Sequence, residues 1–290
     1  MYSVICLSCL HVYTHTDQQT RMEYRPLGNT GMQLSILGMG GSGYGSVYGN
    51  YDEDEAIQSV KYAIIDKGIN YIDTAYWYGQ GSSEVFLGKA LKEIPRSSYY
   101  IGTKVGRYEQ DVQSMFDFSA EKVTRSTEES LQRLQLSYVD LLQVHDIEFA
   151  PSIEMIVNET LPAVERLRDR GLCRFIGITG YPIKVLQDVL ERSSVKIDSV
   201  LSYCRLTLCD TSLADHFKYF QSKGIPLINA SPIGMGLLSP VPLQPWHPAS
   251  FEIKQACAEA VKHCEMKGVD IGRLAIHYSS TFKEVSLIQS

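Results

Sequence analysis

Four ionisable side chains stand at or just after the ends of short apolar segments, and their types suit proton transfer. Asp73 and Tyr78 lie in YIDTAYWYG, Lys104 in YYIGTKVG and His145 in DLLQVHD. If these segments are parallel strands of a closed barrel, their carboxyl ends meet at one mouth. An isolated phenol has a pKa of about 10, and a neighbouring ammonium lowers the phenol pKa. We therefore predict that Tyr78 is an acid/base, that Lys104 lowers its pKa and that Asp73 keeps Lys104 charged.

These side chains would be positioned by βα units, because apolar segments alternate with amphipathic stretches from Glu23 onward. Asp52-x-x-Glu55 is a capping box that opens one helix, and Ser119 is the predicted N-cap of another. Ser119 caps the helix predicted near residues 120–134, and the remaining helices are predicted near residues 83–93, 152–170, 183–192, 251–267 and 271–280, with one more ending near 223. The strands are predicted at residues 36–39, 70–74, 99–104, 139–144, 173–178, 199–203, 226–229 and 285–289.

Eight strands in this alternation predict an α/β fold, a TIM barrel, with a small hairpin at residues 24–25 and 33–34 on its floor. A doubly wound sheet is the main competitor. It is disfavoured because no G-x-G-x-x-G follows an early strand with an acidic residue about 20 positions on. The glycine-rich segment at residues 38–43 follows a hairpin instead. We expect one barrel domain at residues 23–290 and a disordered leader at residues 1–22.

Charge and cysteine content narrow the class of protein further. The net charge of −6 and the lack of like-charge runs argue against a nucleic-acid partner or a basic membrane patch. The apolar run at residues 4–10 is far shorter than a membrane span. The seven cysteines are scattered, and the CxxC at Cys6 and Cys9 has no second pair, so we expect no metal and reduced thiols in the cytoplasm.

The four residues, with D-T-A-x-x-Y-G around Asp73 and Tyr78, resemble the catalytic tetrad of the aldo-keto reductases in order and spacing. The resemblance covers roughly residues 23–289. It implies an NAD- or NADP-dependent oxidoreductase in which His145 orients the substrate oxygen. Two further segments are implied to bind the nucleotide, Thr179-Gly180 and the SPIGMGLL loop at residues 231–238.

The resemblance implies that the first of these segments hydrogen-bonds the nicotinamide carboxamide. Thr179-Gly180 stands where the family usually has a serine and an asparagine, so the hydroxyl remains and one partner is lost. Ser202 matches a usual glutamine. In the SPIGMGLL loop, small residues let backbone N–H groups approach a pyrophosphate. The expected cofactor-binding residues are Gly40, Gly41, Asp73, Thr179, Gly180, Ser202, Ser231, Pro232, Ile233, Gly234, Gly236 and Leu237.

Within the family, GITGYP, LSYCRLTL and SPIGMGLLS are most similar to the branch of L-galactose and NAD-linked D-arabinose dehydrogenases. That resemblance implies oxidation of the C1 hydroxyl of an aldose to a lactone by a monomer, with NAD favoured over NADP. Aromatic residues that would stack on a sugar in the top loops are Tyr44, Tyr48, Trp77, Tyr181 and Trp246.

Two other functions stay open at this point. Family members continue past strand eight with a segment that binds adenosine, whereas this sequence ends at Gln289-Ser290, so we expect a barrel lacking its final helix. A catalytically silent isoform fits that feature. A regulatory nucleotide-binding subunit, as the potassium-channel β subunits of this superfamily are, is the other alternative.

Overall fold

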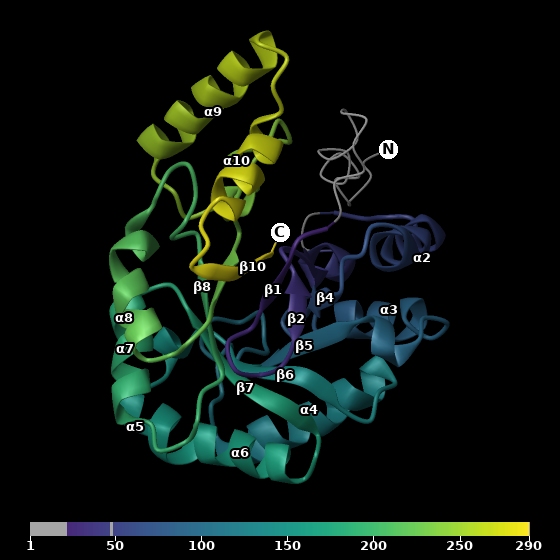
Figure 1. Ribbon diagram of the computed structural model, residues 1–290, viewed down its shortest axis with the longest axis vertical. Coiled ribbons are helices and arrows are strands. Elements are labelled where there is room, and N and C mark those ends of the chain that lie inside the picture. The colour runs from purple at the N-terminus through teal and green to yellow at the C-terminus, as the bar shows by residue number, and fades with distance from the viewer. Residues whose placement is uncertain (1–21, 47–48, 290) are drawn as a thin grey trace.

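The fold is a closed barrel of eight parallel strands, seen in the computed structural model of residues 22–46 and 49–289 (Figure 1). Every neighbouring pair is parallel, and the order around the barrel is β10-β3-β4-β5-β6-β7-β8-β9. The strands are β3 (Leu37–Gly40), β4 (Tyr71–Asp73), β5 (Tyr100–Val105), β6 (Val139–Val144), β7 (Cys173–Gly180), β8 (Ser199–Tyr203), β9 (Leu227–Ala230) and β10 (Val285–Gln289). The predicted TIM barrel is confirmed.

The predicted hairpin is also present and closes the floor of the barrel. β1 (Tyr24–Pro26) pairs antiparallel with β2 (Gln33–Ser35). Leu27, Met32 and Leu34 are fully buried and form one apolar cluster with interior barrel residues such as Tyr71 and Leu287. The hairpin therefore plugs one end of the barrel and leaves the carboxyl ends of the strands as the free mouth.

Helices surround the strands. The α-helices are α2 (Glu53–Lys61), α3 (Ser82–Ala90), α4 (Ala120–Leu134), α5 (Ile153–Met155), α6 (Leu161–Asp169), α7 (Ile183–Arg192), α8 (Phe217–Ser222), α9 (Phe251–Met266) and α10 (Ile271–Ser280). Shorter or wider helical turns are η2 (Gly41–Gly45), η3 (Tyr62–Asp66), η4 (Arg96–Ser98), η5 (Ile147–Phe149), η6 (Ile156–Thr160), η7 (Ser212–His216) and η8 (Gly234–Gly236). In Figure 1, α9 projects from the barrel beside α10.

The predicted caps form as expected, and among the differences in element boundaries two are larger than a shift at a strand or helix end or change the site. The side chain of Asp52 accepts a hydrogen bond from the Glu55 backbone N–H at 2.9 Å, and Ser119 accepts one from Lys122. The helix predicted at 152–170 contains the π-helical turn η6, which separates α5 from α6. β7 runs on to Gly180 because Thr179 and Gly180 still pair with β8.

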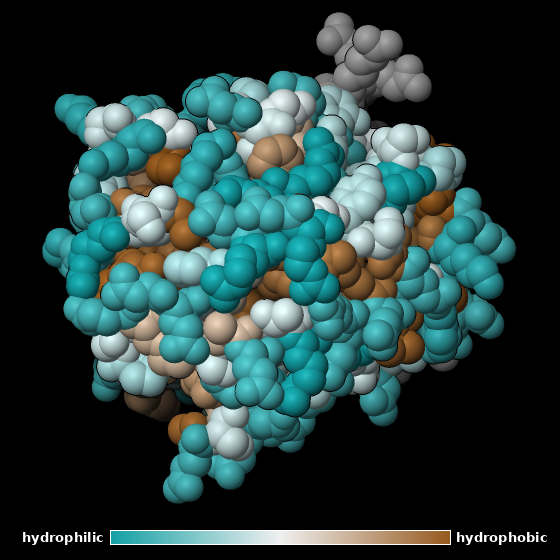
Figure 2. Space-filling view, turned by 90° about the horizontal axis from the view of Figure 1, so that it is seen from below, coloured by the Kyte–Doolittle hydropathy of each residue, from teal (hydrophilic) through white to brown (hydrophobic). Residues whose placement is uncertain are grey.

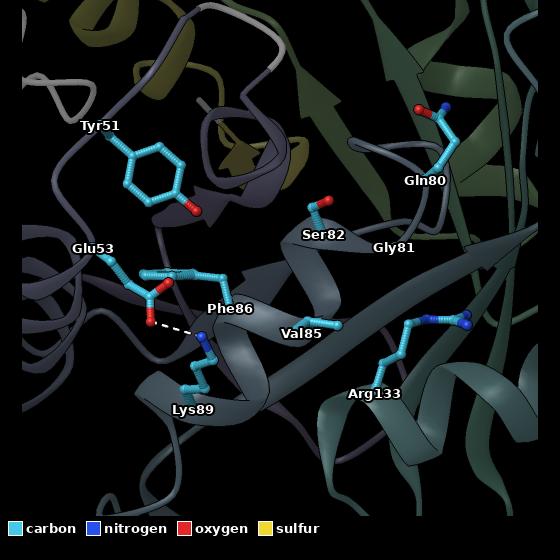
Figure 3. Close-up of a pocket in the computed structure, with 9 residues that line it drawn as sticks. All are labelled: Tyr51, Glu53, Gln80, Gly81, Ser82, Val85, Phe86, Lys89 and Arg133. Atoms are coloured by element: carbon cyan, nitrogen blue, oxygen red, sulfur yellow. Dashed lines mark hydrogen bonds and ion pairs between the residues drawn. The ribbon is translucent and has the colours of Figure 1, made fainter.

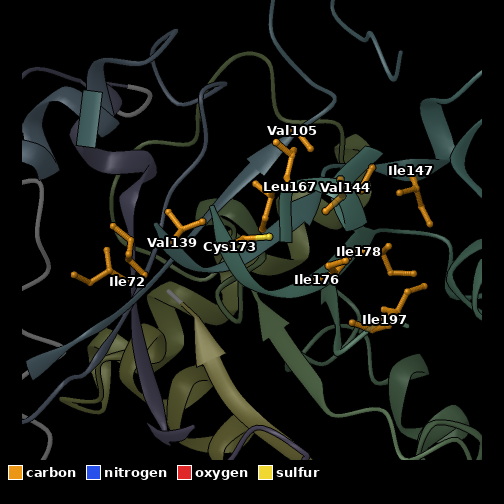
Figure 4. Packing of buried hydrophobic residues seen from close by; sticks show 14 of the residues in the cluster. Ile72, Val105, Val139, Val144, Ile147, Leu167, Cys173, Ile176, Ile178 and Ile197 are labelled. Atoms are coloured by element: carbon orange, nitrogen blue, oxygen red, sulfur yellow. The ribbon is translucent and has the colours of Figure 1, made fainter. Parts of the chain in front are cut away.

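Strand alternation divides the core into two layers. Outward residues such as Ile72, Val144 and Ile176 pack under the helices, as Figure 4 shows. Inward residues such as Tyr71 and Leu141 fill the barrel. Since successive side chains of a strand face opposite sides, Asp73 shares the inward face with Tyr71.

The face in Figure 2 is mostly hydrophilic with small apolar areas between polar side chains. No helix in residues 22–46 or 49–289 is long and apolar enough to cross a membrane. Five cysteines in those ranges are free thiols, whereas Cys6 and Cys9 lie outside the described residues, as does nearly all of the expected leader.

Candidate active site

The four predicted residues meet at the mouth of the barrel around the Lys104 ammonium. Lys104 lies in β5, Asp73 ends β4, and Tyr78 lies in the turn that leads to α3. The Lys104 Nζ donates hydrogen bonds to Asp73 Oδ1, to the Thr74 carbonyl at 2.9 Å and to the Tyr78 phenol at 3.2 Å. All three ammonium donors are thus satisfied. Pairing of this kind is required, because Lys104 is only 2% exposed and a buried unpaired charge is very costly.

The turn that carries Tyr78 is held by close backbone packing. Gly79 has φ of +69°, and a Cβ there would lie 2.4 Å from the Gly45 carbonyl oxygen. The Thr74 hydroxyl contacts Ser83 Oγ at 2.8 Å, which ties the start of the turn to α3. A side chain at either glycine would push the turn away from η2, and the Tyr78 phenol would move with it.

The second oxygen of Asp73 is held by two residues that the sequence interpretation missed. Gln143 Nε2 donates to Asp73 Oδ2 at 2.6 Å, and the Tyr71 hydroxyl donates to it at 3.3 Å. Both side chains are fully buried inside the barrel. A glutamine within the apolar segment LLQV was the available signal, because a buried amide needs a hydrogen-bonding partner.

The pKa of Tyr78 depends on two opposing effects. Burial raises the pKa of the Tyr78 phenol above its usual value, and the lowering effect of Lys104 does not offset it. Burial would lower the pKa of Lys104, but Asp73 and Tyr78 raise it by more, so the ammonium persists. Lys104 therefore acts in the expected direction, yet the resting site pairs a protonated phenol with an ammonium.

His145 follows β6 and faces Tyr78. Its ring lies edge-on to the phenol, with centroids 6.1 Å apart. Burial, Lys104 and Arg107 hold the pKa of His145 well below 6.5, so the imidazole is neutral at neutral pH. Its Nδ1 is buried and has no partner among the described residues. A neutral imidazole beside the phenol suits hydrogen bonding to an uncharged substrate oxygen.

An ion pair at the rim extends the site beyond the tetrad. Arg107 Nη1 donates to Asp146 Oδ2 at 2.8 Å, and its guanidinium lies 4.1 Å from the centroid of the Trp77 ring. Asp146 directly follows His145 and has φ of +50°. Charged and aromatic groups at a mouth suit the binding of a polyhydroxylated ligand. Sequence reasoning singled out Trp77 but missed Arg107 and Asp146.

Most of the expected cofactor-binding residues lie at the carboxyl ends of strands. Gly40 pairs with Asp73 in the barrel, and a Cβ at Gly41 would lie 2.9 Å from the Asp73 carbonyl oxygen. Thr179, on the inward face of β7, accepts a hydrogen bond from the Asp146 backbone N–H at 3.0 Å. These positions surround the mouth that the tetrad occupies.

The segment Ser231-Pro232-Ile233-Gly234-Met235-Gly236-Leu237 forms a tight loop after β9. Left-handed backbone recurs along it, with φ of +56°, +61°, +55° and +103° at Ser231, Gly234, Met235 and Gly236. Gly234, Met235 and Gly236 are consecutive, and the backbone N–H groups of Ser231, Gly234 and Leu237 are bonded to carbonyls of the protein. The loop therefore has the expected small residues and tight turn, and its role in holding a pyrophosphate stays a prediction.

Ser202 and Tyr44 do not lie where they were expected. Leu201 and Tyr203 pack in the barrel interior and Val200 in the outer layer, so Ser202 faces outward. Its side chain therefore points away from the mouth. Tyr44 is buried against Phe86, with ring centroids 4.4 Å apart, and so belongs to the core.

Of the other expected aromatics, Tyr181 and Trp246 are partly exposed, and Tyr48 lies outside the described residues. A hollow of about 300 Å³ lies elsewhere, against α3 (Figure 3). In the close-up an ion pair joins Glu53 and Lys89 at one side, and Arg133 lies at the other. No tetrad residue lines this hollow, so it is separate from the site described above.

The barrel and the site correspond to a known class of oxidoreductase. Residues 36–290 match the sequence profile of the Aldo/keto reductase family, and the chain belongs to that family. It is 48% identical over 272 residues to the L-galactose dehydrogenase of Arabidopsis thaliana, covering 93% of this chain and 83% of the relative. It is 34% identical over 261 residues to the D-arabinose 1-dehydrogenase of Saccharomyces cerevisiae, covering 85% and 75%.

Solved structures support the same class. The aldo-keto reductase AKR11C1 from Bacillus halodurans, in its holo form, superposes with a TM-score of 0.74 at 28% identity. The match covers 93% of this chain and 87% of that one. The protein is thus an aldo-keto reductase with a TIM-barrel fold, an oxidoreductase of a family that uses nicotinamide cofactors and acts on small carbonyl or sugar substrates.

Proposed function

We propose that this protein oxidises the C1 hydroxyl of an aldose, such as L-galactose or D-arabinose, to a lactone. The observation that carries the proposal is the Lys104 ammonium, which is bonded at once to Asp73 and to the Tyr78 phenol at the barrel mouth. Similarity to two aldose dehydrogenases supports this substrate class. The catalytic residues would be Tyr78, Lys104, Asp73 and His145.

The described residues fit a nicotinamide nucleotide. The loop from Ser231 to Leu237 would hold the pyrophosphate, and the ends of β3 and β7 would flank the nicotinamide, which when bound takes hydride from C1. We propose NAD rather than NADP. This preference is the one implied by the resemblance to the branch of L-galactose and NAD-linked D-arabinose dehydrogenases. Addition of NAD and NADP separately to the enzyme tests this preference.

In this account Tyr78 accepts the proton of the C1 hydroxyl. Lys104 stabilises the phenolate that must form, while Asp73, held by Gln143 and Tyr71, fixes the ammonium. His145 donates to or accepts from the substrate oxygen as a neutral imidazole. Arg107 and Asp146 bind further hydroxyls of the sugar at the rim.

The direct test is an aldose screen with the purified chain, followed as absorbance of the reduced nucleotide. L-Galactose and D-arabinose are expected to be oxidised and their 1-deoxy analogues to be inert, because the analogues lack the hydroxyl that Tyr78 deprotonates. Tight nucleotide binding without turnover of any aldose would instead favour the regulatory alternative.

We further propose that residues 23–290 form one barrel domain that follows a leader. We also propose that the protein is a monomer and that it is located in the cytoplasm.

A further inference from the structure

Two cysteine thiols from distant parts of the chain lie in contact outside the barrel mouth. Cys209 lies in the loop after β8, and Cys257 lies in α9, 48 residues further along the chain. Their Sγ atoms are 3.7 Å apart. A disulfide places two sulfurs about 2 Å apart, so a small movement would close the bond. Cys209 is the thiol that can move, because it is exposed in a loop whereas Cys257 is buried in a helix.

The different exposure of the two thiols gives each a role in thiol–disulfide exchange. Cys209 is open to a reagent in solvent, whereas Cys257 is only 6% exposed. Burial, the neighbouring Cys257 and Asp210 raise the pKa of Cys209 to about 11. Exchange requires a thiolate, so the pair reacts slowly at neutral pH and stays reduced in a reducing compartment.

Cys257 also belongs to the apolar contact between α9 and the loop that follows β9. This cluster contains Leu238, Cys257, Val261, Ile271 and Ala275, with Ile233 and Leu237 packed against it. Cys257 and Val261 are the buried residues of α9, a helix that projects from the barrel beside α10 (Figure 1). A covalent bond at Cys257 would therefore hold α9, and Leu238 with it, against the loop after β8.

We propose that Cys209 and Cys257 are a redox modification site, at which a small disulfide such as oxidised glutathione produces an intramolecular disulfide that cross-links α9 to the barrel. The Cys209 thiolate attacks one sulfur of the reagent and releases a glutathione thiolate. The Cys257 thiolate then attacks the Cys209 sulfur and releases the second one. Two protein thiols are oxidised, one glutathione disulfide is reduced, and the two released thiolates take up the two protons that the cysteines lost.

The cross-link has two consequences. It joins residues 48 positions apart and so removes conformational freedom from the unfolded chain, which stabilises the folded protein. It also restrains the loop after β9 through Leu238, so a nucleotide held by that loop would dissociate more slowly. The second consequence rests on the nucleotide binding of the proposed function, whereas formation of the disulfide does not.

The first test treats the purified chain with oxidised glutathione at pH 8 and maps its disulfides by mass spectrometry. The parent protein carries Cys6→Ser and Cys9→Ser, so that this CxxC contributes no disulfide. The expected product has lost two hydrogens and yields a peptide that joins Cys209 to Cys257, and excess dithiothreitol restores both thiols. A stable glutathione adduct at Cys209, or no reaction at either cysteine, overturns the proposal.

Single variants of this parent test the two roles. Cys257→Ser is expected to stop at the glutathione adduct on Cys209, and Cys209→Ser is expected to leave Cys257 as a thiol. Cys264→Ser, in the same helix, is the matched control and should form the disulfide as the parent does. If Cys257→Ser fails to fold, Cys257→Ala replaces it. Modification of Cys257 in Cys209→Ser at the parental rate contradicts the assigned order of attack.

The second test compares the oxidised and the reduced parent. Oxidation is expected to raise Tm by about 5 °C or more, and an unchanged Tm contradicts the cross-link to the barrel. Stopped-flow displacement is expected to show NAD leaving the oxidised protein at least about threefold more slowly, because local opening of the loop is restrained. An unchanged rate contradicts the coupling through Leu238. Reduced protein that binds no NAD contradicts the proposed function, while the mapped disulfide decides the redox site on its own.

Discussion

The Lys104 ammonium lies 3.2 Å from the Tyr78 phenol oxygen while it is also paired with Asp73 in the barrel interior. The cation is thus fixed by the carboxylate and is available to stabilise a phenolate. Burial nevertheless keeps the pKa of Tyr78 above its usual value. The site holds its base in the protonated form and lowers the cost of deprotonating it.

Oxidation should therefore accelerate as the pH rises. The phenolate fraction of Tyr78 grows toward alkaline pH, so kcat/KM for aldose oxidation is expected to increase from about pH 7 to pH 10. Lys104→Met removes the charge that lowers the phenol pKa, and the rise should move to higher pH with at least about a hundredfold loss at pH 8. The measurement is a pH–rate profile of both proteins. A flat wild-type profile over this range would argue that Tyr78 is not the base.

Gln143→Leu should lower both activity and stability. It removes the 2.6 Å bond to Asp73 Oδ2 and leaves part of a buried carboxylate unsatisfied, which costs about 1–3 kcal/mol. With Asp73 free to turn, kcat should fall by about tenfold. Urea unfolding and steady-state kinetics measure the two effects. Gln187→Leu, at a partly buried glutamine bonded to His216, is the matched control and should leave kcat unchanged.

Stability should decrease as the pH falls below about 6.5. The pKa of His145 is well below 6.5 in the folded protein, whereas the unfolded chain takes up a proton near that value. Its contribution is thus complete above pH 6.5 and is lost toward the folded pKa, by at most about 1.4 kcal/mol per pH unit. His145→Gln should flatten the dependence of Tm on pH in this window, and the exposed His263→Gln should not. Identical slopes for all three proteins would contradict the assigned pKa.

The turn that carries Tyr78 should tolerate no side chain at Gly79. Gly79→Ala introduces a Cβ only 2.4 Å from the Gly45 carbonyl oxygen and is expected to cost at least about 3 kcal/mol, with loss of activity. Gly224→Ala also places alanine at a positive φ, but with nothing within 4 Å, and should cost about 1 kcal/mol. Urea unfolding compares them. Equal costs would mean that backbone strain, and not the contact with η2, explains the glycine.

The fold was predictable because its signals are local. The alternation of apolar and amphipathic segments was sufficient to predict β6, α7, β8 and β10 at their observed boundaries. The meeting of Asp73, Lys104 and His145 followed from their places at the strand ends, since parallel strands in a barrel share one mouth.

The missed features depend on three-dimensional contacts. The sequence places Gln143 in an apolar strand, and only the structure shows its amide against Asp73. The ion pair of Arg107 with Asp146 likewise joins residues that follow two different strands. Ser202 was misplaced because a shift of one residue moves a side chain to the other face of a strand. The pKa of Tyr78 depends on burial and Lys104 together, and only the charge was visible in the sequence.

The most direct test of the central claim is kcat/KM for L-galactose oxidation by Tyr78→Phe, measured beside its NAD affinity. The variant loses the proton carrier while the loop from Ser231 to Leu237 is untouched. The account predicts that kcat/KM falls by about 10² to 10⁴ while NAD affinity stays within about twofold of wild type. A variant that keeps more than about a tenth of wild-type kcat/KM would show that another group moves the proton, and the assignment of Tyr78 would be contradicted.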